Sequence, residues 1–253
     1  MIKTVLFLVL LVFGIMSGAK ADEQVEISRF QGERITGIDA SGAFEIKIRQ
    51  GENTGVVLSV PSRFEDQLVV SLSGGKLKIG FKGRIKGKQG DRYTAEIICS
   101  SLEDIDLSGA CYLNGEGDFS GRILSIDLSG AATAKIGGFM EVNGNVKVDL
   151  SGASQFTGKI SAPLMEVELS GASVFTVSGD AGSGKLEVSG AAQAKMGDFT
   201  FGNLNASASG ASYLKAYAKE QMNVSGSGAS KIYYRVDGKL NVHTSGASTV
   251  NQF

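Results

Sequence analysis

The chain has 253 residues and a formal net charge of −1, with 35 glycines but only two prolines and no tryptophan. This near-neutral balance does not favour nucleic acid as a partner. Abundant Gly and Ser among Val, Leu and Ile are typical of many short strands joined by tight turns. The length allows one elongated all-β domain or two small ones.

The N-terminus is typical of a secretory signal peptide over residues 1–21. Lys3 supplies the positive charge, residues 5–15 form an apolar core, and Ala19-Lys20-Ala21 is a small-x-small cleavage site. The apolar core is too short for the roughly 20 residues that a transmembrane helix needs. We therefore expect a mature chain that has no transmembrane segment and that lies in the periplasm, at the outer surface or outside the cell. The alternative is an uncleaved N-terminal anchor.

Residues 22–100 show strand patterns without a regular repeat. Alternating apolar residues predict strands at 44–48, 56–60, 68–72, 77–81 and 93–97. We expect either degenerate coils with one long loop or a β-cap, in both cases continuous with the repeats that follow. A cap would cover strand edges that otherwise invite aggregation.

A basic cluster lies in a Gly-rich stretch of this region, where it predicts a hairpin tip. One interpretation is an anion-binding loop for an anionic glycan, for lipid head groups or for the acidic face of another copy. The other interpretation is a solvated loop. The cluster consists of Lys82, Arg84, Lys86, Lys88 and Arg92.

Two cysteines, Cys99 and Cys111, lie twelve residues apart. In an oxidising compartment a disulfide between them is possible. The alternative is a pair of small apolar side chains on strands. With no Cys-x-x-Cys arrangement and His243 as the only histidine, we expect no zinc site.

The most regular feature is the tripeptide Ser-Gly-Ala, which recurs from Ser108 to Ser245 at spacings of 21, 22, 19, 19, 20, 18 and 18 residues, with a further copy at Ser41. Apolar and polar residues alternate before it, so the residues one and three positions before Ser should face inward. A second apolar set lies five positions after Ser. Each repeat therefore holds at least two strands. The residues three positions before Ser include Ile105, Ile126, Val148, Val167, Leu186, Val224 and Val242.

A repeat of about 20 residues cannot bury its own apolar face, whereas stacked copies form one continuous core. The spacing predicts an all-β fold, a single-stranded parallel β-helix over residues 101–253 whose coils rise about 4.8 Å each. Ser-Gly-Ala should form a corner of each coil, because Gly permits a positive φ and Ala is small. The alternative is a pair of antiparallel sheets with hairpins at Gly pairs.

The signal peptide, the segments Ile38-Asp39-Ala40-Ser41-Gly42-Ala43-Phe44 and Gly75-Lys76-Leu77-Lys78-Ile79, and the serial Leu-Ser-Gly-Ala copies support a family assignment. In these features the chain resembles the auto-transporter adhesin family that is built on the head GIN domain. The resemblance covers residues 30–250. It implies a secreted bacterial protein with a right-handed β-helix and an adhesin-like role, and it supplies no catalytic residues.

The outward residues two positions before Ser are acidic in five successive copies and uncharged beyond them. They are Asp106, Asp127, Asp149, Glu168 and Glu187, followed by Ser207, Ser225 and His243. Carboxylates stacked about 5 Å apart would repel one another and raise some pKa values or recruit cations. One interpretation is a cation-binding face that takes calcium; the other is an exposed acidic face that Lys147, Lys159 and Lys185 neutralise.

Enzyme activity is not expected. A glycosidase needs two carboxylates across a cleft, whereas these carboxylates repeat along a row, and His243 has no evident nucleophile partner. Candidate sugar-stacking platforms occur at Tyr112, Tyr213, Tyr217, Tyr233 and Tyr234, which can equally be packing residues. The sequence predicts a non-catalytic extracytoplasmic protein that contacts carbohydrate or a cell-envelope protein. The alternatives are a structural or assembly module of the envelope and a polysaccharide-degrading enzyme.

Overall fold

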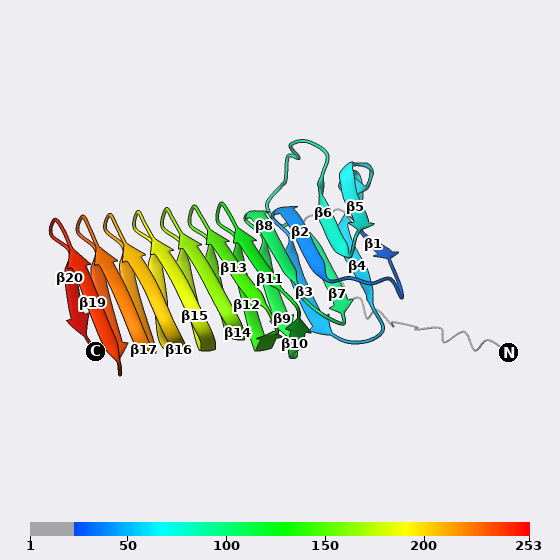
Figure 1. The fold of residues 1–253 in the computed structure, drawn as a ribbon. Coiled ribbons are helices and arrows are strands. Elements are labelled where there is room, and N and C mark those ends of the chain that lie inside the picture. Colours follow the sequence, from blue (N-terminus) through cyan, green and yellow to red (C-terminus); the bar gives the residue numbers. More distant parts are fainter. Residues whose placement is uncertain (1–22) are drawn as a thin grey trace.

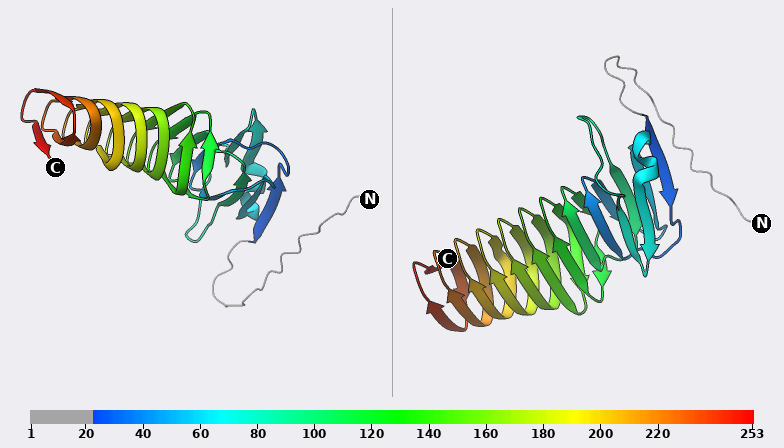
Figure 2. Two further views of the ribbon diagram at one scale, coloured as in Figure 1. Left: turned by 60° about the horizontal axis from the view of Figure 1, so that its bottom comes forward. Right: turned by 90° about the horizontal axis from the view of Figure 1, so that it is seen from above.

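The computed structural model describes residues 23–253, so the predicted signal peptide lies outside the described residues. The all-β prediction is confirmed, with 67% strand, 3% helix and a β-solenoid of about seven turns. Figure 1 shows the coils stacked side by side, with the N-terminal region at one end and the C-terminus at the other. Figure 2 shows the same stack as a continuous spiral. Among the described residues no helix is long and apolar enough to cross a membrane.

The first sheet is formed by the strands that run into the Ser-Gly-Ala corners, and all of them pair in parallel. The pairing joins each coil to the next in register, for example Ile105 to Ile126 and Ile126 to Val148. Its separate strands are β2 (Gly37–Gly42), β8 (Asp104–Gly109), β11 (Leu124–Leu128), β13 (Asn145–Leu150) and β19 (Lys239–Thr244).

The second sheet is formed by the strands that leave the corners, again in parallel register. Four long strands belong to both sheets, because each continues from the second sheet around the coil into the first. The separate strands are β3 (Glu45–Gln50), β9 (Tyr112–Glu116), β10 (Phe119–Gly121), β12 (Thr133–Val142), β18 (Lys231–Val236) and β20 (Thr249–Gln252). The long strands are β14 (Gln155–Leu169), β15 (Val174–Val188), β16 (Gln193–Ala208) and β17 (Tyr213–Gly226).

Each Ser-Gly-Ala forms a tight corner whose glycine has a positive φ, from +66° to +78° between Gly109 and Gly246. In most coils the N–H two residues after Gly also bonds back to the corner Ser carbonyl, as from Ala132 to Ser129. A positive φ at the first central residue alone is the signature of a type II′ turn. The Ala N–H donates to the Gly carbonyl of the preceding coil at 2.7–2.8 Å, from Ala110 through Ala247. We call this series of bonds the corner ladder.

The core lies between the sheets and includes the inward residues that the alternation predicts, beside others such as Phe199 and Phe201 that belong to neither predicted set. Ile105, Ile126 and Leu186 are at most 1% exposed. The second apolar set is also buried, and Phe156 stacks on Phe175 with ring centroids 5.5 Å apart. Both sequence-predicted inward sets are thus confirmed in the coils before the C-terminal one, where Val242 is 44% exposed.

The N-terminal region combines a degenerate coil with an antiparallel cap, so each of the two sequence expectations is met in part. β6 (Lys76–Phe81) pairs in parallel with β2, and β7 (Thr94–Cys99) pairs in parallel with β3. Their coil therefore lies at the end of the stack, on the side of the β2–β3 coil away from β8 and β9. Antiparallel strands then cover it: β5 (Leu68–Ser73) on β6, β4 (Gly55–Pro61) on β7, and β1 (Gln24–Arg29) on β4. A 3₁₀ helix, η1 (Ser62–Gln67), joins β4 to β5.

This arrangement sets the start of the coil stack earlier than the predicted residue 101. β2, Ser41-Gly42-Ala43 and β3 already form a coil, which stacks directly on β8 and β9. The antiparallel alternative from the sequence is wrong for the repeats, because all repeat strands pair in parallel.

The corners predict a strong dependence on glycine. A Cβ on Gly171 would lie 2.6 Å from the Gly152 carbonyl oxygen, whereas a Cβ on Gly74, also at positive φ, would meet nothing within 4 Å. We expect Gly74→Ala to lower the free energy of unfolding by about 1 kcal/mol, because alanine is strained at a positive φ. Gly171→Ala should lower it by about 2 kcal/mol more than Gly74→Ala does, because its Cβ would also clash with the preceding coil. Urea unfolding followed by circular dichroism measures both. Equal losses would show that the corner contact is unimportant.

Candidate functional site

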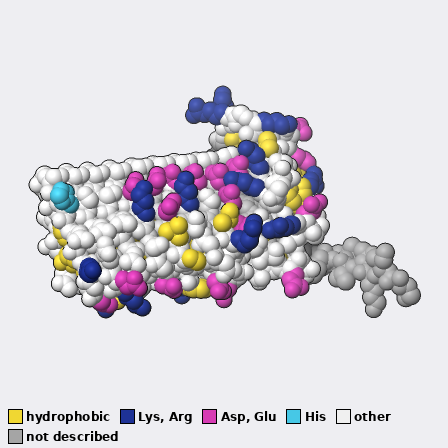
Figure 3. All heavy atoms as spheres, viewed as in Figure 1, with side chains coloured by type: hydrophobic (Ala, Val, Ile, Leu, Met, Phe, Trp, Pro, Cys, Tyr) yellow, Lys and Arg dark blue, Asp and Glu magenta, His cyan; other side chains and the backbone are white. Residues whose placement is uncertain are grey.

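The first sheet carries the acidic column, namely Asp106, Asp127, Asp149, Glu168 and Glu187. The strand register pairs each of these residues with the next one along the stack. Figure 3 shows the row of acidic side chains running along this face. Beyond Glu187 the same positions hold Ser207, Ser225 and His243, in continuous register. The structure therefore brings the predicted acidic residues together, about 4.8 Å from coil to coil.

Lysines neutralise the two ends of this row but not its middle. Lys76 lies 3.1 Å from Asp104 and 3.4 Å from Asp106, and Lys185 lies 2.6 Å from Glu187. Lys78 pairs with Asp39 in the same way at 3.2 Å. The sequence interpretation that Lys159 helps neutralise the acids is wrong, because Lys159 lies after the corner in β14 and faces a groove on the second sheet.

Asp127, the second carboxylate of the row, has no ion pair among the described residues. Partial desolvation and the carboxylates of Asp106 and Asp149 raise the pKa of Asp127 above its usual value. Within the described residues, no group of three or more His, Cys, Asp or Glu side chains is placed to hold one metal ion. The cation-binding interpretation stays a prediction, since any calcium would have to bridge neighbouring coils.

Beyond the acidic column the outward positions of the first sheet hold an asparagine ladder in place of carboxylates. The Asn223 amide donates to the Asn205 side-chain oxygen at 2.7 Å, and the Asn241 amide donates to that of Asn223 at 2.8 Å. A shallow groove of about 380 Å³ runs between these asparagines and the Ser207, Ser225 and His243 positions. Because the asparagines bond to one another, much of their hydrogen-bonding capacity is already used.

The second sheet carries a larger groove, of about 790 Å³, that crosses five coils from Ile136 to Lys215. It follows a line of register irregularities, which fall between Lys135 and Phe139, between Thr176 and Gly179, and between Met196 and Thr200. Bulges bend a strand and redirect its side chains. Glycines and small residues at the bend leave the space open, and the lining includes Gly137, Gly158, Ser178 and Gly197. We call it the lysine groove.

The lysine groove is cationic. Lys159, Lys195 and Lys215 line it, and among the described residues Asp198 is the one acidic member of the lining. Among residues 23–253, neither Lys159 nor Lys195 has a salt-bridge partner. Thr157, Thr176 and Gln193 add hydrogen-bonding groups between the cations. The sequence analysis missed this site, although lysines recur six positions after Ser at Lys135, Lys195 and Lys215 and could have indicated it.

Aromatic side chains lie at the C-terminal end of the lysine groove. Tyr213 lines it and packs on Tyr233 with ring centroids 5.5 Å apart. Lys215 lies 4.2 Å from the ring centroid of Phe253. Of the other tyrosines predicted as platforms, Tyr112 lies under Lys135, Tyr217 under Arg235, and Tyr234 packs partly against the core. The structure thus gives one tyrosine, Tyr213, direct access to the groove.

The basic cluster is not a hairpin tip, which corrects the sequence expectation. β6 and β7 pair with β2 and β3 and not with each other, so the segment between them is the corner of the degenerate coil. It projects from the stack in Figure 1, and Figure 3 shows Lys and Arg side chains gathered on it. We call residues 82–92 the basic loop. Lys82, Arg84, Lys86, Lys88 and Arg92 are all exposed.

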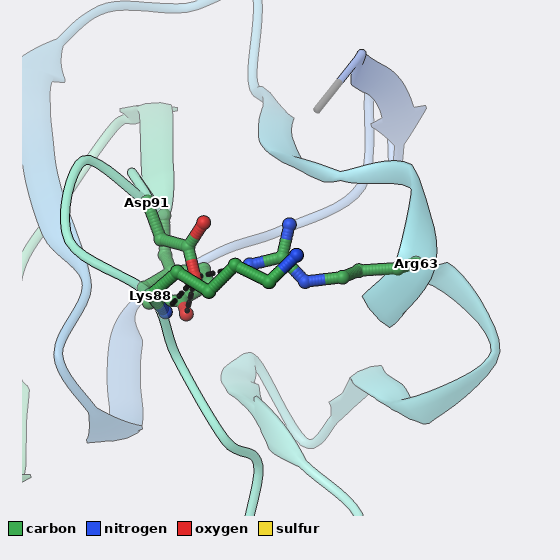
Figure 4. A network of polar contacts seen from close by, with 4 residues as sticks. Arg63, Lys88 and Asp91 are labelled. Carbon is green, nitrogen blue, oxygen red and sulfur yellow. Dashed lines mark hydrogen bonds and ion pairs between the residues drawn. The ribbon is translucent and has the colours of Figure 1, made fainter. Parts of the chain in front are cut away.

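The base of the basic loop is held by Asp91. Its carboxylate accepts the Lys88 backbone N–H at 2.6 Å and the Tyr93 hydroxyl at 3.2 Å, and it pairs with Arg63 of η1 (Figure 4). The bonds from Lys88 and Arg63 hold the pKa of Asp91 below its usual value. A charged contact to the cap therefore fixes the loop at its C-terminal end.

Of the two interpretations of the cysteine pair, the disulfide is wrong, because both cysteines are free and buried. Cys99 lies opposite Gln50 at one end of β3, and Cys111 lies next to Phe44 at its other end. Six residues of strand span about 20 Å, far beyond the roughly 7 Å between Cα atoms that a disulfide allows. Burial raises the pKa of Cys99 to about 12 and also raises that of Cys111.

Comparison with known proteins identifies relatives of the same fold. The family described as "Putative auto-transporter adhesin, head GIN domain" matches residues 34–238. No curated protein matches the chain. A structure from Parabacteroides merdae ATCC 43184 named a "putative adhesin" is 14% identical, with a TM-score of 0.82 over 91% of this chain and 96% of its own. One from Parabacteroides distasonis ATCC 8503 named a "Putative lipid binding protein" is 16% identical, with a TM-score of 0.82 and the same coverage. At these identities the structures establish the fold alone.

Free cysteines can be tested directly with a thiol reagent. The reagent should modify neither thiol of the native protein, purified without reductant, because both thiols are buried and their pKa values are raised. After unfolding in guanidinium chloride, both thiols should react. A denatured protein that shows no reactive thiol would instead contain the disulfide.

Partial desolvation of Asp127 and repulsion from its neighbours in the acidic column predict a pH-dependent stability. The folded-state pKa of Asp127 is raised, so the folded state binds more protons and its stability falls as pH rises from the unfolded value through the folded one. We expect Asp127→Asn to stabilise the protein by a few tenths of a kcal/mol at about pH 7 and to have no effect at about pH 3. Urea unfolding at both pH values measures this.

The matched control is Glu187→Gln, which removes a carboxylate already paired with Lys185. It should give no gain at about pH 7. An equal gain from both variants would attribute the effect to net charge and not to the position of Asp127.

Proposed function

Because the chain belongs to the family described as "Putative auto-transporter adhesin, head GIN domain", we propose that it is a non-catalytic, adhesin-like protein of the cell envelope that binds carbohydrate in the lysine groove. The observation that carries this proposal is the continuity of the groove across five coils. An extended glycan lying parallel to the stack would meet similar groups at each coil, about 4.8 Å apart.

The lining of the groove has the chemistry that carbohydrate requires. Lysine ammonium groups donate hydrogen bonds to sugar hydroxyls and carboxylates. Thr and Gln side chains both donate and accept, and the Tyr213 ring can cover the apolar face of a sugar at the end of the groove. The coils fix the backbone spacing of these residues before a ligand arrives, which lowers the entropic cost of binding.

A binding role agrees better with the groove than hydrolysis does. Glycosidases place two carboxyl groups on either side of the scissile bond. The lining of the lysine groove contains one carboxylate, that of Asp198, among three lysines. The acids of the first sheet repeat along a row on another face, and none of them faces a partner across this groove.

A glycan array followed by calorimetry on the strongest glycan tests the proposal. We expect Lys195→Gln to weaken binding roughly tenfold, the loss of one charge-assisted hydrogen bond. Tyr213→Ala should weaken it as well. The matched control is Lys147→Gln, which removes an exposed lysine from the first sheet and should leave affinity unchanged.

Two results would contradict the proposal. If no glycan binds while crosslinking captures one stable envelope protein, the protein is a protein-binding or assembly module. Release of reducing ends from a bound polysaccharide would show that the protein is an enzyme.

A further inference from the structure

The corner ladder lacks one bond, at the first corner of the stack. Every corner alanine from Ala110 to Ala247 donates its N–H to the Gly carbonyl of the preceding coil. The coil that precedes Ala43 is the degenerate β6–β7 coil, which has the basic loop where the others have Ser-Gly-Ala. Among the described residues, no backbone carbonyl accepts the Ala43 N–H.

Open space accompanies the missing bond. At the corners from Gly109 to Gly246, a Cβ would lie 2.5–2.9 Å from the preceding Gly carbonyl oxygen, whereas at Gly42 it would meet nothing within 4 Å. The basic loop borders this space, where a partly open pocket has a volume of about 410 Å³. We call it the loop pocket. It is lined by Ser41, Gly42, Ala43, Phe81, Gly83, Arg84, Ile85, Gly87 and Tyr93.

The loop pocket is apolar on one side. Phe81 and Tyr93 pack against each other with ring centroids 5.2 Å apart, and Phe81 also stacks on buried Phe44 at 5.3 Å. Ile85 adds an aliphatic wall. Tyr93 is fixed further by its hydrogen bond to Asp91, which Arg63 holds in turn (Figure 4). The apolar side of the loop pocket is therefore in place without a ligand, because packing within the protein holds its aromatic rings.

Two donors that suit an anion, the Ala43 N–H and the Arg84 guanidinium, lie in the pocket beside the hydroxyls of Ser41 and Tyr93. Among residues 23–253 the Ala43 N–H has no acceptor, and Arg84 is the charged residue of the lining. Guanidinium groups and free backbone N–H groups both favour oxyanions. Pockets of this size with apolar walls and a few convergent polar groups are typical of small-molecule sites.

We propose that the loop pocket binds an anionic amphiphile, a carboxylate or phosphate head attached to an apolar chain. The head takes the place of the missing Gly carbonyl, accepting the Ala43 N–H and pairing with Arg84. The chain lies on Phe81, Ile85 and Tyr93. This site is separate from the lysine groove and does not depend on glycan binding.

Decanoate and decyl phosphate are suitable probes, measured by calorimetry with the folded protein below their micelle concentrations. We expect at least one to bind and to shift the amide resonance of Ala43 in a nitrogen-15 correlation spectrum. A preference for either probe supports the proposal and identifies the head group. Arg84→Gln should weaken binding at least tenfold.

The matched control is Lys86→Gln, which removes an exposed charge from the same loop outside the pocket lining and should change affinity less than twofold at physiological salt. Both positions are exposed, so neither variant is expected to unfold the protein. Equal losses of affinity from the two variants would show that binding depends only on the overall charge of the basic loop, and would overturn the proposal.

Three further results would also overturn it. Acetate or inorganic phosphate binding as tightly as the decyl compounds would show a site for free anions only. Decyl maltoside, which is uncharged, competing equally would show nonspecific apolar contact. An unshifted Ala43 resonance in the presence of saturating decanoate would place the ligand elsewhere.

Discussion

Direct backbone contact between coils at the Ser-Gly-Ala corner is the constraint on which the rest of the structure depends. The corner glycine has a positive φ, and the preceding glycine carbonyl occupies the space where its Cβ would be. The next residue, alanine, closes the contact with a hydrogen bond of 2.7–2.8 Å. Because neighbouring corners cannot shift past each other, the strands on both sides keep one register through the stack, and the inward residues of each coil meet their equivalents.

This constraint explains what could be predicted from sequence. Corner spacing and alternation together specify which residues face inward and which stack, so the buried positions of Ile105 and Leu186 and the register of the acidic column followed directly. The order of coils in space could not be predicted in this way. The chain places the β6–β7 coil outside the β2–β3 coil, and spacing along a sequence carries no information about such a reversal.

The lysine groove was missed for a related reason. Period-two alternation tells which residues face outward but not where a coil bends, and the bends depend on bulges such as that between Met196 and Thr200. Lys159 was therefore assigned to the acidic face although it lies on the other side of the coil. The outcome separates charge: the carboxylate row lies on the first sheet, and Lys159, Lys195 and Lys215 lie together on the second.

Both proposed sites lie where the repeat is broken. In a regular coil the corner N–H and carbonyl groups are hydrogen-bonded to neighbouring coils, and the two sheets are flat. Few unpaired polar groups and little hollow space are then left for a ligand to contact. The bulges open the lysine groove, and the degenerate coil leaves the Ala43 N–H and the space above Gly42 without a neighbour. The regular coils on which these irregular segments are built are tightly packed and hold the segments in fixed positions. A polar group fixed by a packed scaffold binds at a lower entropic cost than one on a flexible segment.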